Sequence, residues 1–275
     1  MITASVVLFH TKQTLIDTII ESYGPAEDRL LFLVDNSPEE GADQGFGESS
    51  RPYVYIHHTG RNTGYGSGHN IAIREAVRLG SNYHVVLNPD LSFSPKVIDA
   101  LASYATDHSD VVYMLPEVVD QNGELQHLCK LLPRPSDLIL RRFFPHLPGA
   151  KKKNDRYVLL DKDYNKIMNP PCLSGCFMFL RVETIKKYSL YFDQRFFMYC
   201  EDFDLIRRLH RVGKTIYYPL VTITHIHERG SYHSIRMLCH HLASAIRYFN
   251  KYGWIRDPER DRMNEEITGQ GMENP

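Results

Sequence analysis

Residues 4–38, ASVVLFHTKQTLIDTIIESYGPAEDRLLFLVDNSP, determine the fold class of this chain. Two short apolar runs, Ala4–Phe9 and Leu30–Val34, flank a helical segment from Thr14 to Tyr23. Continuous apolar runs are typical of strands buried on both faces, and the order strand, helix, strand predicts a parallel pair with a right-handed crossover. The chain is therefore expected to form an α/β fold.

The segments that follow repeat this pattern and extend the predicted sheet. Further strands are expected at Tyr53–His57, Tyr83–Leu87 and Val111–Leu115, with helices at Ile71–Leu79 and Pro95–Tyr104. Alternating strands and helices of these lengths favour a mostly parallel sheet flanked by helices.

Composition excludes several classes of protein. The chain has 275 residues, 43% of them hydrophobic, and its 32 basic and 33 acidic residues leave a formal net charge of -1. This balance argues against a general nucleic-acid binder, and no apolar run approaches the ~18 residues of a membrane-spanning helix. Five cysteines without close pairing suit reduced thiols, and the absence of a signal-like start leads us to expect a cytoplasmic protein.

Polar residues follow several of the predicted strands. Asp35 ends the second strand, the glycine-rich loop Asn62–Asn70 follows the third, and Asn88-Pro89-Asp90 follows the fourth. Each has an ordinary alternative, because Asp, Asn, Gly and Pro are also common turn residues. Together they favour a nucleotide site at the carboxyl ends of the strands, where the Asp90 carboxylate would suit a hard divalent cation.

Two acids, Glu201 and Asp202, open an amphipathic helix directly after the aromatic run Phe196–Tyr199. First-turn acids commonly do no more than offset the positive end of the helix dipole. Acids beside buried aromatic groups can also accept a proton from a substrate. The sequence alone leaves both interpretations open.

The last third of the chain contains a possible metal site and a helical end. His225 and His227 alternate on a predicted strand, so both imidazoles would lie on one face and could bind a metal, although chance pairing is plausible among 14 histidines.

Residues 126–168 are interpreted as an insertion at the rim of the site. Ser234–Tyr252 is a predicted helix, and the polar residues after Arg262 are expected to fray.

These motifs, in this order, resemble the family 2 glycosyltransferases of GT-A fold, and among them the bacterial rhamnosyltransferase-like enzymes of surface-polysaccharide assembly. The resemblance covers nearly the whole chain. It rests on VDNSP, NTGYGSGHN, VVLNPDL, LSGCFMFLR, FFMYCEDFDLIRR, THIHERGSYHS and SAIRYFNKYGW.

The resemblance implies a role for each acid and loop of the nucleotide site. Asp35 would hydrogen-bond the pyrimidine base of a nucleotide sugar. Asn88 and Asp90 would form the metal motif that holds Mg²⁺ or Mn²⁺ on the diphosphate. Asn88 stands where the family's motif has an acid, and this departure is usual among the rhamnosyltransferase-like members. Three residues of the glycine loop would shape the donor pocket: Asn62, Gly64 and Asn70.

The resemblance also implies the catalytic group. Asp202 would act as general base in a single inverting displacement, and Glu201 would position it or bind the acceptor. His225 is preferred to His227 as the additional metal ligand. The implied domains are a nucleotide-sugar-binding and catalytic unit at 1–228, a helical extension at 229–263 and a flexible tail at 264–275.

The expected activity is transfer of L-rhamnose from dTDP-rhamnose to a lipid-linked glycan acceptor in O-antigen or capsule synthesis. Three alternatives remain: the same reaction with a UDP-sugar donor, a nucleotidyltransferase that makes nucleotide sugars, and a non-catalytic scaffolding subunit. A nucleotidyltransferase would need a glycine-rich loop with Arg and Lys just after the first strand, where this chain has Phe9–Lys12. Salt-sensitive peripheral contact with the cytoplasmic membrane is predicted. The alternative is that the C-terminal helix packs on the sheet and its charged side chains face water. The residues for this contact are Arg141–Phe144, Lys151–Lys153, Arg236, Arg247, Lys251, Tyr252 and Trp254.

Overall fold

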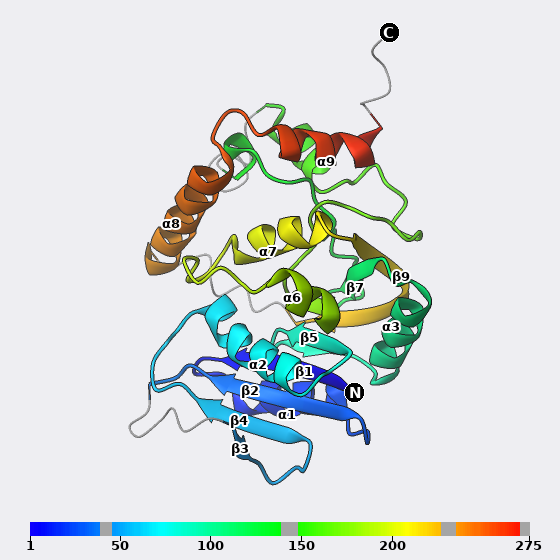
Figure 1. Cartoon of the computed structure of the whole chain (residues 1–275). Helices are drawn as coiled ribbons and strands as arrows, with labels where there is room; N and C mark the ends of the chain where they lie inside the picture. Colours follow the sequence, from blue (N-terminus) through cyan, green and yellow to red (C-terminus); the bar gives the residue numbers. More distant parts are fainter. Residues whose placement is uncertain (39–45, 139–147, 227–234, 270–275) are drawn as a thin grey trace.

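The computed structural model describes residues 1–38, 46–138, 148–226 and 235–269 (Figure 1). Its centre is one nine-stranded sheet with the strand order β3-β4-β2-β1-β5-β8-β7-β9-β6. The first half is a block of parallel strands in which β1 pairs with both β2 and β5, and β2 pairs with β4. These strands are β1 (Ile2–Leu8), β2 (Arg29–Asp35), β4 (Val54–His58) and β5 (Tyr83–Leu87).

An antiparallel strand joins this block to the second half of the sheet. β8 (Phe177–Arg181) pairs antiparallel with β5 on one side and with β7 (Val111–Val119) on the other. β9 (Lys214–His225) then runs parallel to β7 as one long strand with an irregular register. Short strands at the two edges, β3 (Gly47–Glu48) and β6 (Leu91–Ser92), pair antiparallel with β4 and β9.

Helices complete the fold. The sheet-flanking helices are α1 (Gln13–Tyr23), α2 (Tyr65–Arg78), α3 (Lys96–Asp107) and α6 (Val182–Tyr188). The others are α5 (Ala150–Tyr157), α7 (Glu201–His210), α8 (Ile235–Tyr252) and α9 (Pro258–Thr268). Figure 1 shows α8 and α9 at the end of the molecule opposite β3 and β4, with α7 between them and the sheet. The predicted α/β class with a large, mostly parallel central sheet is confirmed.

Two predicted boundaries were wrong. α2 begins at Tyr65 instead of Ile71, because Gly66 and Gly68 lie inside its first turns and allow the backbone to approach neighbours. A Cβ at Gly68 would lie 2.7 Å from the Val7 side chain. The glycine-rich stretch is therefore largely helical, and its glycines serve helix–strand packing.

The frayed tail predicted after Arg262, and the flexible tail from 264, begin inside α9. The Asp257 side chain accepts a hydrogen bond from the Arg260 amide and caps this helix. Met263 is buried, and the Asn264 side chain bonds both backbone groups of Leu132. Their contacts hold α9 against the 126–168 segment.

Among the described residues, no helix has the length and apolar character needed to span a bilayer.

Candidate active site

A cleft of about 590 Å³ opens where the carboxyl ends of β1 and β5 meet the amino end of α7. Polar groups from four separate segments line it: His10, Thr11, Lys12, Asn88, Asp90, Glu201, Asp202 and His225. Apolar and aromatic side chains complete its walls, and they include Val7, Leu15, Tyr65, Met198, Tyr199 and Met237. A concave site with a few convergent polar groups on an apolar wall is the usual form of a ligand pocket.

Asp90 and His225 lie together on one side of the cleft. β6 pairs Leu91 with His225, and this register brings Nε2 of His225 to 3.3 Å from Oδ1 of Asp90. Both groups are largely shielded, and that carboxylate oxygen is buried without a hydrogen-bond partner. Nδ1 of His225 lies 3.3 Å from the amide oxygen of Gln126, which can only accept, so a neutral imidazole that donates from Nδ1 would leave a lone pair on Nε2.

Asn88 faces the cleft but its side chain is already engaged. The Tyr65 hydroxyl lies 3.0 Å from Oδ1 of Asn88 and 2.9 Å from the carbonyl oxygen of Gly175. Burial, then the nearby charge of Glu201, raises the pKa of Tyr65 well above its usual value, so the phenol stays a hydrogen-bond donor. Tyr65 thus links the Asn88 turn to the segment around Gly175, which faces Glu201 and Asp202.

Glu201 and Asp202 enter the cleft from a strained turn. Tyr199 and Cys200 have φ values of 67° and 61°, a left-handed conformation that side chains other than glycine seldom adopt. Strain of this kind persists only when the surroundings impose it, and it concentrates at functional sites. Here it projects the two acids of the first turn of α7 toward the cleft.

The two acids have an unusual electrostatic environment. Burial, and then the charge of Asp202, raises the pKa of Glu201 well above its usual value. Burial also raises the pKa of Asp202, against the opposing influence of Lys130. Oε2 of Glu201 is buried without a hydrogen-bond partner, whereas Oδ1 of Asp202 accepts the Phe203 amide at 2.8 Å. A raised pKa makes a carboxylate a stronger proton acceptor.

A close backbone approach fixes Asp202. A Cβ added at Gly175 would lie only 2.8 Å from the Cβ of Asp202, so only glycine fits opposite this acid. On the other side, the Tyr65 amide donates to the carbonyl oxygen of Phe197 at 3.1 Å. Gly64 approaches the same carbonyl, and a Cβ there would lie 2.4 Å from it. The glycine loop therefore packs on the strained turn that leads to the acids.

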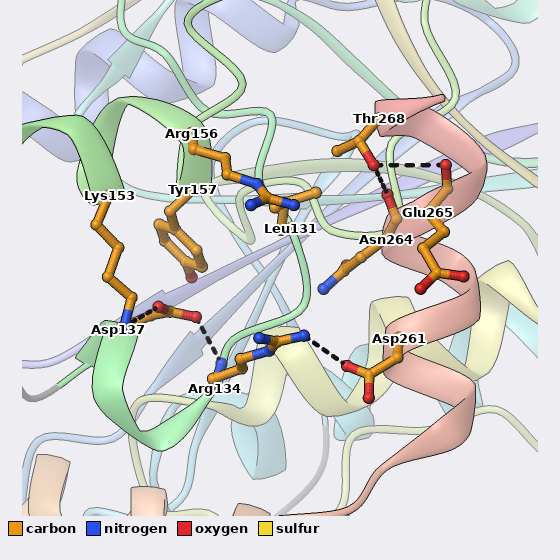
Figure 2. Close-up of a pocket in the computed structure, with 10 residues that line it drawn as sticks. All are labelled: Leu131, Arg134, Asp137, Lys153, Arg156, Tyr157, Asp261, Asn264, Glu265 and Thr268. Carbon is orange, nitrogen blue, oxygen red and sulfur yellow. Dashed lines mark hydrogen bonds and ion pairs between the residues drawn. The ribbon is translucent and has the colours of Figure 1, made fainter. Parts of the chain in front are cut away.

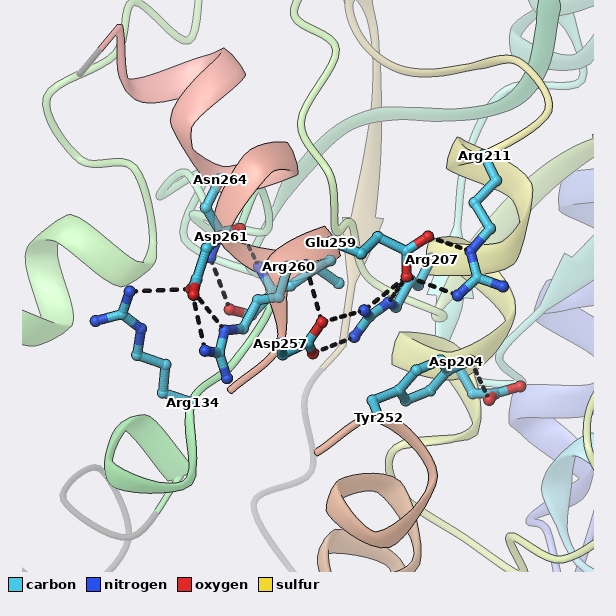
Figure 3. A network of polar contacts seen from close by, with 11 residues as sticks. Arg134, Asp204, Arg207, Arg211, Tyr252, Asp257, Glu259, Arg260, Asp261 and Asn264 are labelled. Atoms are coloured by element: carbon cyan, nitrogen blue, oxygen red, sulfur yellow. Dashed lines mark hydrogen bonds and ion pairs between the residues drawn. The ribbon is translucent and has the colours of Figure 1, made fainter. Parts of the chain in front are cut away.

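The third acid of α7, Asp204, has a structural role. It is fully buried, and its carboxylate pairs with Arg208 and Lys251 and accepts the Tyr252 hydroxyl at 2.7 Å. Arg207, one residue before Arg208, pairs with Asp257 and Glu259 at the start of α9 (Figure 3). The structure thus divides the acids of the first turn: Asp204 anchors α7 to the C-terminal helices, and Glu201 and Asp202 remain for the cleft.

Several residues expected to bind the nucleotide do not line the cleft. Asp35 stands at the end of β2, where one oxygen accepts the Ser37 amide and the other lies 3.5 Å from Nδ1 of His58. Oδ1 of Asn62 accepts the Gly64 amide. Asn70 is fully buried, and its side chain makes two hydrogen bonds to the backbone of Phe192.

Asn70 therefore has a structural role here: it holds α2 to the segment before α7. His227 and the predicted Arg141–Phe144 patch lie outside the described residues. In the described part of the chain, no group of three or more His, Cys, Asp or Glu side chains could hold a metal.

Sequence reasoning missed Tyr65, Lys12 and Met237 as parts of the cleft. The alternation of glycines around Tyr65 marked a close approach but did not reveal its partner. Met237 could not be found by motif, because α8 reaches the cleft only through tertiary packing.

A second cavity of about 280 Å³ lies between α5, the segment around Arg134, and α9 (Figure 2). Its charged groups pair largely with one another: Arg134 with Asp261, and Lys153 with Asp137. Internal pairing of this kind leaves little net charge for a ligand. The cavity is separate from the acids of α7, and we assign the chemistry to the larger cleft.

Comparison with known proteins shows which enzymes the chain resembles. No family model matches the sequence. An N-acetylglucosaminyl-diphospho-decaprenol L-rhamnosyltransferase of Mycobacterium tuberculosis is 26% identical over 247 residues, which cover 84% of this chain and 78% of that protein. The rhamnosyltransferase WbbL of Escherichia coli K12 is 23% identical over 273 residues, or 94% and 97% of the two chains.

Solved structures show the same fold. S. aureus TarS residues 1–349 in complex with UDP-GlcNAc superposes with a TM-score of 0.56 and 12% identity, covering 97% of this chain and 71% of that one. GalNAc-T7 with UDP, GalNAc and Mn²⁺ gives a TM-score of 0.57 and 12% identity over 82% of this chain, which spans only 43% of that protein. The chain is thus a glycosyltransferase of GT-A fold that resembles rhamnosyltransferases in sequence.

Proposed function

We propose that this enzyme transfers L-rhamnose from dTDP-L-rhamnose to a lipid-linked glycan, with inversion at the anomeric carbon, in cell-surface polysaccharide synthesis. The rhamnosyltransferases of M. tuberculosis and E. coli support the sugar, and the name of the first, which specifies a diphospho-decaprenol, supports a lipid-linked acceptor. The observation that carries the reaction class is the Glu201–Asp202 pair, which faces the same cleft as Asp90 and His225.

In the proposed reaction, Asp202 accepts the proton of the acceptor hydroxyl while that oxygen attacks the anomeric carbon. The bond from this carbon to the diphosphate oxygen breaks in the same step, so the leaving group departs as dTDP. A buried carboxylate with a raised pKa suits proton transfer near neutral pH. Glu201, whose Oε2 is buried without a partner, is placed to bind an acceptor hydroxyl.

A divalent cation, Mg²⁺ or Mn²⁺, is the cofactor that we propose. The donor set fits, because the buried Oδ1 of Asp90, which accepts no hydrogen bond, is a hard oxygen ligand and the imidazole of His225 brings Nε2 to 3.3 Å from it. When bound, the cation would supply positive charge to the diphosphate and so stabilise the leaving group. Among the described residues, Asp90 and His225 would be the protein ligands, and phosphate and water would complete the coordination.

One assay tests both the choice of sugar donor and the role of Asp202 as general base. Release of the nucleoside diphosphate, dTDP or UDP, is measured with dTDP-rhamnose, dTDP-glucose and UDP-GlcNAc, with Mg²⁺ or EDTA and a soluble acceptor glycan. UDP-GlcNAc belongs in the panel because TarS was solved with it. The Asp202→Asn variant should keep donor affinity and lose ~10²–10⁴ in turnover, because an amide cannot accept the proton.

Asp261→Asn is the matched control, since Asp261 lies on α9 away from the cleft. Wild-type turnover by folded Asp202→Asn would refute the base assignment. Release of nucleoside diphosphate from UDP-GlcNAc alone would refute the donor but leave the reaction class intact. We also propose that the enzyme works at the cytoplasmic face of the membrane, where a lipid-linked acceptor is accessible.

A further inference from the structure

Helix α8 has an inner face that is fixed to the catalytic segment. Ser244 donates its hydroxyl to the carbonyl oxygen of Met198 at 2.7 Å, and Tyr248 and Phe249 are buried. The His240 ring stacks on Phe197, with ring centroids 4.6 Å apart. These contacts involve Phe197 and Met198, just before Glu201 and Asp202, so they hold α8 in one orientation relative to the cleft.

The outer face of the same helix is apolar and exposed. Leu242 and Ile246, one turn apart, are 40% and 48% exposed. The indole of Trp254 is 45% exposed and donates to Oδ1 of Asn250 at 2.8 Å, which holds it at the end of this stripe, and Ile255 is 88% exposed. Four of the nine exposed large apolar side chains in the described residues gather here, so they form a patch instead of the usual scatter.

A groove deepens this patch. It has a volume of about 90 Å³ and lies between α8 and the segment that contains Pro135 and Leu138. Leu242, Ile246 and Trp254 form its outer lip, and its other lining residues are His241, Ala245 and Phe249. An apolar hollow beside exposed apolar side chains can hold a hydrocarbon chain.

The charge around the patch has one sign. From Ile235 to Arg256 the sequence contains no Asp or Glu, and Arg247 and Arg256 are exposed. Lys251 and Tyr252, expected from sequence to contact headgroups, instead bind inward, with Lys251 held by Asp193 and Asp204. A basic helix with a large apolar face and an interfacial tryptophan is typical of attachment to an anionic membrane surface.

We propose that an apolar patch, made of Leu242 and Ile246 on α8 and of Trp254 and Ile255 just after it, inserts into the surface of an anionic lipid bilayer. This deepens the proposed function, because an acceptor carried on a lipid is confined to that surface. Met237, at the other end of α8, lines the cleft, so docking through this helix would hold the cleft near the headgroups. Attachment through apolar insertion would also be less sensitive to salt than the basic and aromatic contact expected from sequence.

The chain provides its own probe, because Trp254 is its single tryptophan. Tryptophan fluorescence is followed as vesicles of phosphatidylcholine, with or without phosphatidylglycerol, are added to the full-length protein. The expected result is a blue shift and reduced acrylamide quenching with the anionic vesicles, and co-sedimentation that largely survives raised salt. Cys239 is the exposed cysteine, and an environment-sensitive label there should report the same insertion.

The Ile246→Gln variant should bind vesicles about tenfold more weakly, because its side chain no longer favours the hydrocarbon. Leu220→Gln is the matched control: Leu220 is 67% exposed on β9, and its variant should bind like the wild type. Both variants should release dTDP normally with a soluble acceptor, which separates this test from that of the proposed function.

Three results would overturn the proposal. The first is the absence of any fluorescence change with anionic vesicles at low salt. The second is equal vesicle binding by wild type and Ile246→Gln. The third is a dimer, seen by sedimentation velocity without lipid and lost in Ile246→Gln, which would show that a second copy covers this face.

Discussion

Arg207 on α7 and Asp257 before α9 form a two-pronged ion pair, with guanidinium nitrogens 2.6 and 2.5 Å from the two carboxylate oxygens (Figure 3). Their side chains are 2% and 4% exposed, and the Arg207 guanidinium lies 4.0 Å from the centre of the Tyr252 ring. Fifty residues of sequence separate the pair, so it closes the C-terminal helices onto the helix that carries the catalytic acids.

We expect Arg207→Ala to lower the free energy of unfolding by ~3–5 kcal/mol, because it leaves the Asp257 carboxylate buried without its partner. Arg211→Ala is the control: Arg211 pairs with the same Glu259 as Arg207 but is 41% exposed, so its loss should cost ~0–1 kcal/mol. Denaturant unfolding measures both. Equal losses in the two variants would show that burial of the Arg207 pair contributes nothing special.

Asp90→Ala should weaken metal-dependent donor binding and turnover together, because it removes the one carboxylate beside His225. His225→Ala should show the same defect in smaller measure, since an imidazole is the weaker ligand for a hard cation. Calorimetry of donor binding with Mg²⁺ and with EDTA separates the metal-dependent part. His108→Ala, on the surface after α3, should behave as wild type. Unchanged metal-dependent affinity in both site variants would disprove the site.

Gly175→Ala should reduce turnover strongly while leaving the fold intact, because the new methyl would push on the Cβ of Asp202 from 2.8 Å. A displacement of about 1 Å can cost ~10² in rate when it misplaces a catalytic group. The control is Gly47→Ala, where the nearest atom would be 3.8 Å away. Steady-state kinetics and thermal unfolding are compared. If turnover falls only in proportion to the folded fraction, Gly175 has no positioning role.

The buried histidines predict loss of stability in mild acid. Burial lowers the pKa of His84 to about 3, and its ring lies 2.8 Å from the Thr3 hydroxyl and 2.9 Å from that of Ser5. The pKa of His69 is also lowered well below its usual value by burial, then by the charge of His84. The unfolded chain takes up protons near pH ~6.5 while the folded imidazoles stay neutral, so this stability is full above that pH and falls toward pH ~3.

Each such histidine contributes a slope of ~1.4 kcal/mol per pH unit in that window. His84→Gln keeps the capacity to hydrogen-bond Thr3 and Ser5 but cannot titrate, so its unfolding free energy should depend less on pH between 6 and 5. Exposed His108→Gln should leave the slope unchanged. Identical slopes in wild type and His84→Gln would show that His84 is not held neutral.

The sequence predicted the parts of the fold that depend on local pattern. Apolar runs gave the strands β1, β2, β4 and β5 nearly to the residue, and the first-turn acids marked the start of α7. Local pattern alone could not distinguish Asp202, which the resemblance singled out, from Asp204 on the same helix, because the structural role of Asp204 depends on Lys251 and Tyr252 from α8.

The same limit applies to Asn70 and α9. Asn70 stands in a motif of the glycine loop, yet its amide bonds a backbone 122 residues away. α9 is polar along most of its length, so hydropathy predicted a tail, whereas ion pairs to Arg207 and Arg211 stabilise it as a helix. Long-range polar contacts leave little trace in composition or periodicity.

The left-handed pair at Tyr199 and Cys200 has a consequence for engineering this enzyme. Glycine at position 200 would relieve a conformational cost of ~1–2 kcal/mol, but it would also remove a buried side chain that belongs to a cluster with Phe196, Tyr248 and Phe249. The same change would widen the range of backbone conformations of the turn that carries Glu201 and Asp202. A search for thermostable variants should therefore leave this residue unchanged, because the relief of strain is offset by lost packing and by lost order at the two acids.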